Sequence, residues 1–213
     1  SLPQAIGMML DPADCGPAFI GLPQDVAAEA FDYPVEMFRT TVHRIARPRP
    51  DLDQVDVAVE AIRGASRPVI IAGGGVHYSR AEAELSDFAN RFGIPVVETV
   101  AGKSTLLSTD PAYAGPIGVT GADAANVVAA EADIVIAVGT RLEDFTTGSW
   151  TAFAPEARFV TVNAARFDAL KHRAIPVVAD AREALADLAG SLEGWHAPAG
   201  WTARGREMRE QLR

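Results

Sequence analysis

An unbroken apolar run, Ile134–Val138, is the sequence feature that most restricts the fold. The run contains only Ile, Val and Ala, follows Asp133 and stops at Gly139. Such a run, without polar alternation, is typical of a strand that is buried on both faces, as in parallel sheets. The polar residues 139–150 would then follow the carboxyl end of a parallel strand, which is where open α/β sheets bind ligands. We therefore predict a ligand-facing loop at 139–150.

Helix and strand patterns alternate along much of the chain. Apolar runs predict further strands at 68–72, 95–99, 158–162 and 176–178, and apolar spacings of three and four predict helices at 52–65, 79–92, 122–132 and 180–192. We expect Ser79 and Asp180 to be helix N-caps and Gly93 to end the second helix. Strands that alternate with helices of this length pair in parallel through right-handed crossovers. The predicted fold class is α/β, with a doubly wound, Rossmann-like parallel sheet.

Four segments are expected along the chain. Residues 1–30 contain the end of a helix near 2–10 and a short strand at 18–21, and residues 31–51 form a proline-punctuated interdomain linker. Residues 52–193 form the α/β domain, and residues 194–213 form a charged, helical tail that leads either to another domain or to nothing. Because the chain starts without Met and inside a helical pattern, we expect a piece of a longer polypeptide.

Charge and cysteine content restrict the partners and the location. Lys and Arg number 19 against 28 Asp and Glu, giving a net charge of -9, which disfavours nucleic acid and an anionic membrane surface as partners. No apolar run approaches the ~20 residues of a membrane span, and the first residues do not resemble a signal peptide. Cys15 is the only cysteine, so no intrachain disulfide can form. We expect a structural thiol and a cytoplasmic location.

Three glycines, at 73–75, follow the predicted strand at 68–72. Such a turn could bring a phosphate close to the backbone, but the dinucleotide fingerprint requires glycine at position 78, which is Tyr78. Asn163 likewise stands where nucleotide-binding domains often carry an acid for the ribose. A tight structural turn is the alternative interpretation. The candidate cofactor-binding residues, with FAD, NAD and ADP as candidate ligands, are Gly73, Gly74, Gly75, Gly139, Thr140, Arg141 and Asn163.

The remaining loops show no catalytic constellation. The triplet at 102–104 is not a P-loop, because position 97 is Val97 where that motif needs glycine. Lys103 is expected either to meet a phosphate or carboxylate or to be solvated. The adjacent acids Glu143 and Asp144 would diverge, which favours a solvated rim or an interface over acid–base catalysis. The four histidines lack the spacing of metal ligands, and they are His43, His77, His172 and His196.

The order of the loops resembles a known family. The chain reads LPQDV at 22–26, GGG at 73–75, ETVAGK at 98–103, GPIGVTG at 115–121, ADIVIAVGTRLEDFTTGSW at 132–150 and VNAARFDALKH at 162–172. Over roughly residues 1–193, this set resembles the thiamine-diphosphate-dependent enzymes of the acetolactate synthase type. Within that group it resembles the hydrolases that cleave a C–C bond of a cyclic 1,2-dione in myo-inositol catabolism.

The resemblance implies an enzyme of three α/β domains. Residues 1–30 would be the end of the pyrimidine-binding domain, and residues 52–193 the central, NAD/FAD-binding-like (DHS-like) domain. Thiamine diphosphate and Mg²⁺ would be held by the other two domains, so the resemblance implies no catalytic residue in this chain and no activity of the fragment alone. Its partners would be the other domains of the same polypeptide, in a homo-oligomer that is a dimer or a tetramer.

One departure from the acetolactate synthases bears on the substrate. Those enzymes read GARFDDRVTG where this chain reads GTRLEDFTTG at 139–148, so Phe145 replaces their second arginine. Arginine suits a carboxylate, and phenylalanine suits a neutral ring. The predicted substrate-facing residues are Val119, Thr120, Asp144 and Phe145. An acetolactate-synthase-like carboligase or decarboxylase, and a free-standing nucleotide-binding module, are the alternative interpretations.

Overall fold

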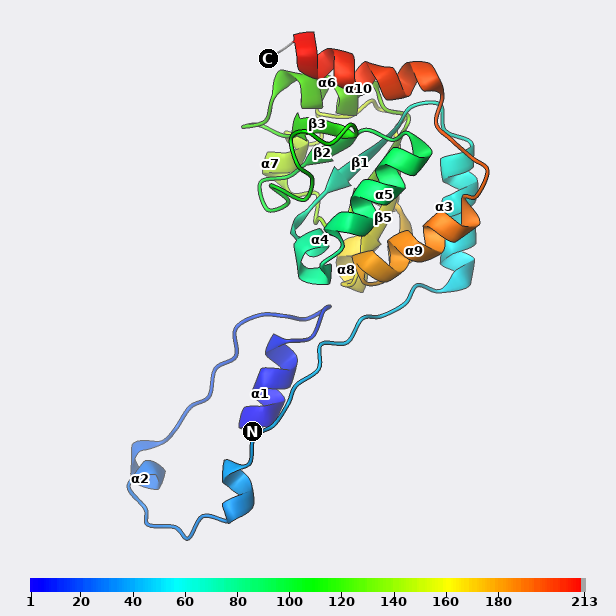
Figure 1. Cartoon of the computed structure of the whole chain (residues 1–213). Helices are drawn as coiled ribbons and strands as arrows, with labels where there is room; N and C mark the ends of the chain where they lie inside the picture. The colour runs from blue at the N-terminus through cyan, green and yellow to red at the C-terminus, as the bar shows by residue number, and fades with distance from the viewer. Residues whose placement is uncertain (212–213) are drawn as a thin grey trace. The chain divides into compact units, whose positions relative to one another are not determined.

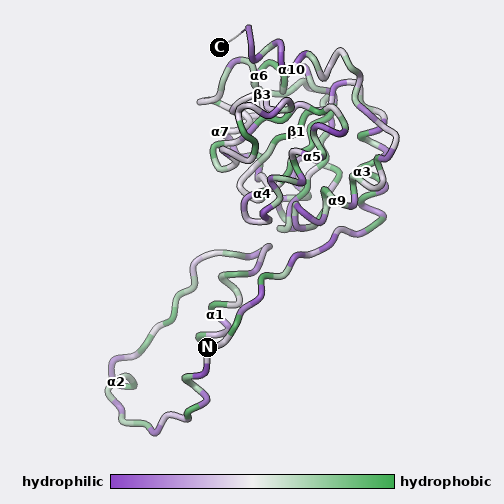
Figure 2. Tube along the Cα trace, viewed as in Figure 1, coloured by the Kyte–Doolittle hydropathy of each residue, from purple (hydrophilic) through white to green (hydrophobic). Residues whose placement is uncertain are grey.

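The structure is a computed structural model that describes residues 1–211, and the chain divides into two compact units, residues 1–46 and residues 47 onward. The first unit contains α1 (Leu2–Met9), α2 (Gln24–Ala27) and the 3₁₀ helix η1 (Val35–Phe38), joined by extended segments (Figure 1). None of its residues is buried, although apolar stretches recur along it (Figure 2). The predicted helix at 2–10 is confirmed. The predicted strand at 18–21 is wrong, because within the described residues this segment pairs with no other strand.

The second unit is built on one sheet of six parallel strands in the order β3-β2-β1-β4-β5-β6. The central strands β1 and β4 are buried at every residue, because helices cover both faces of the sheet. The doubly wound α/β fold is therefore confirmed. The strands are β1 (Pro68–Ala72), β2 (Val96–Glu98), β3 (Tyr113–Pro116), β4 (Ile134–Val138), β5 (Arg158–Asn163) and β6 (Ile175–Val178).

Helices on the two faces of the sheet form separate groups (Figure 1). Helix α9 contacts α3, α4 and α5 on one face, and α6 contacts α10 on the other. The helices of this unit are α3 (Leu52–Arg63), α4 (Gly74–Ser79), α5 (Glu82–Phe92), α6 (Asp123–Glu131), α7 (Asp144–Thr147), α8 (Arg166–Ala169), the 3₁₀ helix η2 (Lys171–Arg173), α9 (Ala181–Ser191) and α10 (Ala199–Gln211).

The segment after β1 differs from the sequence prediction. Ser79 is the last residue of α4 and not the N-cap of α5, which follows Ala81. Between the two helices, Arg80 adopts a left-handed conformation with φ 52° and breaks the helical path. A short helix thus begins at Gly74, directly after the glycine turn. Strand β3 was also missed, because its four residues lie in and beside a glycine-rich segment that was expected to be a loop.

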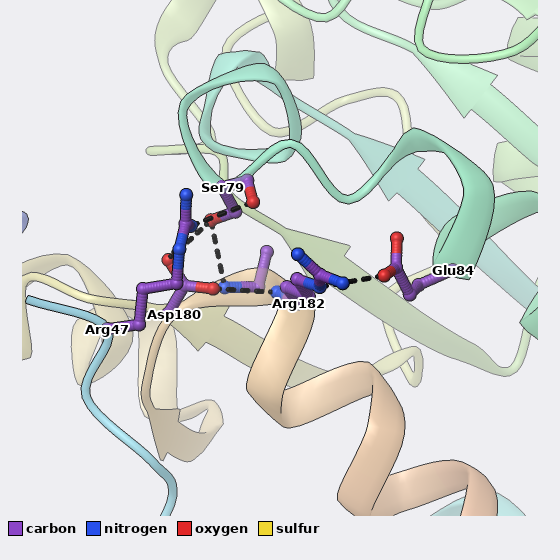
Figure 3. A network of polar contacts seen from close by, with 6 residues as sticks. Arg47, Ser79, Glu84, Asp180 and Arg182 are labelled. Carbon is purple, nitrogen blue, oxygen red and sulfur yellow. Dashed lines mark hydrogen bonds and ion pairs between the residues drawn. The ribbon is translucent and has the colours of Figure 1, made fainter. Parts of the chain in front are cut away.

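A buried carboxylate, Asp180, joins three elements of this unit (Figure 3). It is the N-cap of α9, as predicted, and accepts a hydrogen bond from the Arg182 amide at 3.0 Å. It also accepts from the Ser79 hydroxyl and from Arg47 Nη1, each at 2.9 Å. Arg47 donates in addition to the Ser79 carbonyl at 2.7 Å. The network therefore fixes the beginning of the second unit to α4 and α9.

Helix α10 packs against α6 and the edge strand β3. The Trp201 side chain is buried, and its indole N–H donates to the Pro68 carbonyl at 2.7 Å. Arg204 forms a bidentate contact with Glu131, with N–O distances of 2.7 and 3.1 Å. The second unit thus continues beyond residue 193 and includes α10. No helix in the described part of the chain is long and apolar enough to cross a membrane.

Candidate functional site

The strand order places a switch point between β1 and β4. The chain runs outward from β1 to β2 and β3, then returns to the other side of β1 to form β4. In open parallel sheets, ligands bind beyond the carboxyl ends of the strands at such a point. The loops that begin at Gly73 and at Gly139 meet here. The sequence prediction of a loop at the ligand-binding edge of the sheet thus agrees with the topology.

Three glycines let these two loops touch, and we call Gly73, Gly75 and Gly139 the glycine contact. The Gly75 amide donates to the Gly139 carbonyl at 2.9 Å. A Cβ on Gly73 would lie 2.3 Å from the Gly139 oxygen, and one on Gly75 would lie 2.5 Å from the Gly139 Cα. Gly139 also has φ +61°, a conformation that favours glycine. Backbone packed directly against backbone is therefore what requires glycine at these positions.

The same geometry tests whether the turn could hold a dinucleotide diphosphate. A phosphate at a helix N-terminus needs backbone N–H groups that point at it. Here the amides of Gly73, Gly75 and Val76 donate to the carbonyls of Val138, Gly139 and Gly73, respectively. The residues present thus fit a packed turn and not a phosphate cradle. The assignment of Gly73, Gly74 and Gly75 to cofactor binding stays a prediction.

Thr140 and Asn163 join the loops that follow β4 and β5. The Asn163 side-chain amide donates to the Thr140 carbonyl at 3.2 Å, and its oxygen accepts from the Ala165 amide at 2.9 Å. Arg141 is exposed and lies 3.6 Å from Asp168, an ion pair of little energetic weight. The structure thus brings together Thr140 and Asn163, which were predicted to bind a cofactor. The Asn163 side chain holds the two loops against each other. Their role toward a cofactor stays a prediction.

The predicted substrate-facing residues lie on two loops that contact each other. The Val119 amide donates to the Phe145 carbonyl at 2.9 Å, so the loop after β3 packs against α7. Gly118, with φ +111°, permits this contact, because a Cβ there would lie 2.3 Å from the Phe145 oxygen. The side chains of Val119 and Phe145 remain 66% and 67% exposed. We call this pair the apolar rim.

Polar residues flank the apolar rim. Thr120 and Asp144 are exposed, and Asp144 accepts a hydrogen bond from the Ser149 hydroxyl at 2.8 Å. The neighbouring Glu143 instead lies 3.7 Å from Arg141. The two adjacent acids therefore bind different partners and do not form an acid–base pair within the described residues.

An aromatic cluster behind α7 was not predicted from the sequence. Trp150 lies 3.7 Å from His172 and 5.5 Å from Phe159, measured between ring centroids, and Phe153 lies 5.1 Å from Phe159. Burial, and then the charge of Lys171, lower the pKa of His172, so this ring favours its neutral form. Three aromatic residues close in sequence (150, 153 and 159) were the available signal. The cluster anchors the end of the loop that carries Phe145.

A buried carboxylate shapes the loop after β2. Glu98 accepts hydrogen bonds from the amides of Ser104 and Leu106, at 3.2 and 2.8 Å, and from the Thr105 hydroxyl at 2.8 Å. These contacts fix the backbone around Lys103, whose side chain is exposed. Sequence reasoning gave Glu98 no role of its own, although it begins the ETVAGK segment, because a single acid at the end of an apolar strand does not reveal which groups it binds.

The described residues contain neither a candidate metal centre nor a disulfide bond. Within residues 1–211, no three His, Cys, Asp or Glu side chains gather where they could hold a metal ion. Cys15 is exposed in the first unit and is not disulfide-bonded. The role of the apolar rim and its polar flanks toward a substrate stays a prediction.

Comparisons with known proteins agree with the fold and the loop order. Relatives called 3D-(3,5/4)-trihydroxycyclohexane-1,2-dione hydrolase are 46% identical over 190 residues in Clostridium perfringens, 48% over 191 residues in Bacillus cereus and 46% over 188 residues in Geobacillus thermodenitrificans. The matches cover 89%, 89% and 88% of this chain, but only 30%, 30% and 29% of the relatives. Residues 55–188 match the family model described as thiamine pyrophosphate enzyme, central domain. The chain therefore belongs to the family of thiamine pyrophosphate enzyme central domains.

Proposed function

We propose that this chain forms the central part of a thiamine-diphosphate-dependent hydrolase that cleaves a C–C bond of a cyclic 1,2-dione in myo-inositol catabolism. The observation that carries the proposal is the identity of 46–48%, over 89% of this chain, to relatives called 3D-(3,5/4)-trihydroxycyclohexane-1,2-dione hydrolase. The apolar rim at the ligand-binding edge supports it, because Phe145 occupies the position where acetolactate synthases have a carboxylate-binding arginine.

The rim and its flanks suit an uncharged polyol ring. Phe145 and Val119 offer an apolar surface for the carbon skeleton, and Thr120 and Asp144 offer a hydroxyl and a carboxylate for ring hydroxyl groups. No arginine or lysine lies within this set of four residues, so a keto-acid carboxylate would find no positively charged partner among them. We therefore propose that these four residues form one wall of the substrate site.

The reaction centre would be held by the rest of the polypeptide. Thiamine diphosphate supplies the carbanion stabilisation that C–C cleavage needs, and Mg²⁺ would hold its diphosphate. This chain would position the substrate ring and exclude water from one side. We propose that the full-length protein is a cytoplasmic homo-oligomer, dimeric or tetrameric, and that the chain alone has no activity.

The experiment uses the full-length enzyme with the cyclic dione and with pyruvate as substrates. We expect turnover of the dione and none of pyruvate, and we expect Phe145→Arg to lower kcat/KM for the dione by at least about tenfold, which corresponds to ~1.4 kcal/mol of transition-state stabilisation. The matched control is Val57→Arg, which adds the same charge at an exposed apolar residue of α3. Turnover of pyruvate together with inactivity toward the dione would instead indicate an acetolactate-synthase-like carboligase or decarboxylase.

A further inference from the structure

His77, on α4, makes hydrogen bonds through both nitrogens of its ring. Nδ1 lies 2.8 Å from Glu82 Oε1, at the beginning of α5. Nε2 lies 3.0 Å from the backbone carbonyl oxygen of Lys103, in the loop after β2. The imidazole therefore bridges two segments that are distant in sequence, and one of them lies at the ligand-binding edge of the sheet.

Both partners of the ring are acceptors. An ionised carboxylate and a backbone carbonyl have no proton to donate, whereas a neutral imidazole carries only one N–H. A neutral His77 would thus satisfy one contact and place a nitrogen lone pair against an oxygen lone pair at the other. Only the imidazolium, with a proton on each nitrogen, satisfies both contacts at once.

The charges around His77 favour the imidazolium. The hydrogen bond to Glu82 raises the pKa of His77 most, against the effect of burial, and the Lys103 carbonyl and the negative charges of Glu82 and Glu98 raise it further. Burial acts to raise the pKa of Glu82, but the hydrogen bond from His77, one from the Glu82 backbone and the charges of His77 and Arg80 outweigh burial and lower it. The groups that face the ring from α5, from β2 and from the loop thus act in the same direction.

The Lys103 carbonyl belongs to a tightly folded loop. Ser104 has φ 71°, which a residue with a side chain adopts only when its surroundings hold it there. Glu98 binds the Ser104 and Leu106 amides from the strand side. His77 binds the same loop from the α4 side, at the Lys103 carbonyl, so its loss would remove this side-chain hydrogen bond between α4 and the loop.

We propose that His77, protonated on both nitrogens, clasps the loop at 102–105 to α4, and that loss of one proton releases the Lys103 carbonyl and loosens this loop. The proposal concerns the chain itself and does not depend on the proposed reaction. It makes the mobility of one loop at the ligand-binding edge dependent on pH.

The test combines two NMR measurements on the 213-residue chain. The ring nitrogen shifts of the four histidines are followed against pH, and amide hydrogen exchange of Ser104 and Leu106 is recorded over the same range as protection factors, which removes the intrinsic pH dependence of exchange. We expect His77 to titrate above His172, whose pKa is lowered. We also expect protection of the loop to fall at least about threefold through the titration of His77.

Two carboxamide variants on the first turn of α5 form a matched pair. Glu82→Gln removes the charged partner of His77 and should move the His77 titration, and with it the loss of loop protection, to lower pH. Glu84→Gln removes an equal charge two residues away, where the carboxylate binds Arg182 at 2.8 Å, and should move neither. His77→Gln should abolish the pH dependence of loop protection, with unchanged far-ultraviolet circular dichroism as the check on folding.

Three results would overturn the clasp. The first is a His77 titration at or below that of His172. The second is loop protection that does not change through the His77 titration. The third is an equal response of Glu82→Gln and Glu84→Gln, which would indicate a general effect of charge on α5.

Discussion

The glycine contact and the apolar rim lie at the same edge of the sheet but are built in opposite ways. At the glycine contact, between the loops after β1 and β4, backbone meets backbone and the N–H groups are already bonded. At the apolar rim the two loops also meet through their backbones, but both side chains point outward and stay two-thirds exposed. Backbone packing thus fills the position where the topology favours a ligand, and the exposed side chains of this edge lie on the neighbouring loops.

The largest expected effect comes from Gly139→Ala. The new Cβ would lie 2.6 Å from the Gly75 Cα, and the residue would keep a left-handed φ of +61°. Overpacking costs about 1–3 kcal/mol and the left-handed conformation about 1–2 kcal/mol, so we expect a loss of roughly 2–5 kcal/mol in the free energy of unfolding. Urea denaturation followed by circular dichroism measures it.

Gly190→Ala is the matched control for that substitution. Gly190 lies in α9, and nothing lies within 4 Å of the position of its Cβ. Because alanine favours helix over glycine, we expect no change or a gain of up to about 1 kcal/mol. Equal losses in the two variants would show that the glycine contact does not depend on close packing.

The next largest effects come from two phenylalanine substitutions, which distinguish a loss of activity from a loss of stability. Because its ring is mostly exposed, Phe145→Ala should change the free energy of unfolding of this chain by no more than about 0.5 kcal/mol. Phe153→Ala, in the buried aromatic cluster, should cost roughly 3–5 kcal/mol. In the full-length enzyme, Phe145→Ala should nevertheless lower kcat/KM for the cyclic dione by about tenfold. If Phe145→Ala lost as much stability as Phe153→Ala, the role of Phe145 would be structural.

Elements with a strong local sequence pattern could be predicted from the sequence, whereas elements that depend on distant partners could not. The central strands were predicted because burial on both faces leaves an uninterrupted apolar run, as in Ile134–Val138. Strand β3 was missed because an edge strand of four residues that includes Gly115 and Pro116 carries little apolar pattern. Ser79 was misassigned because its hydroxyl binds Asp180, a partner 101 residues away, and not the backbone of its own helix.

The candidate site also depends on contacts between residues that are distant in the sequence. A glycine turn indicates that something approaches the backbone closely, but the sequence does not say whether a ligand or another loop does so. Here the approaching group is Gly139, which is distant from Gly75 in the chain. Val119 and Phe145 were named as substrate-facing, a role that stays a prediction. Their contact joins the loops after β3 and β4, and no local sequence pattern encodes it.

A change in pH should have a smaller effect on the free energy of unfolding. Because the pKa of His77 is raised above the ordinary value of 6.5, its clasp contributes stability below that value, and the contribution is lost as pH rises through the pKa of the folded state. Since the pKa of Glu82 is lowered from its ordinary value of 4.5, the contribution of Glu82 to stability is present above pH 4.5. It is lost as pH falls through the pKa of the folded state. The ring is 37% exposed, so solvent screens the pair and the change should be small.

The measurement is a series of urea denaturations between pH 6 and pH 9. We expect the free energy of unfolding of the native chain to fall slightly more than that of His77→Gln across this range. The reverse order, with the variant losing more stability, would show that protonated His77 does not stabilise the folded chain.

The smallest expected effect is the thermal shift with FAD, NAD or ADP. A ligand present at 100 times its Kd stabilises a protein by about 2.7 kcal/mol, which would be visible as a rise in Tm. Because the amides of the glycine contact are already bonded, we expect no rise with any of the three. A clear rise with one of them would restore Gly73, Gly74 and Gly75 as cofactor ligands and break the comparison.

Helix α10 has a consequence for aggregation. Strand β3 is one of the two edges of the sheet, and an uncovered edge presents unpaired backbone groups that can pair with another chain. Helix α10 packs on β3 and α6, and Arg209 donates to the backbone carbonyl of Tyr113 in β3 at 2.9 Å, so α10 covers part of this edge. We therefore expect a chain shortened before α10 to expose apolar surface beside an open edge at β3 and to self-associate more readily than the native chain.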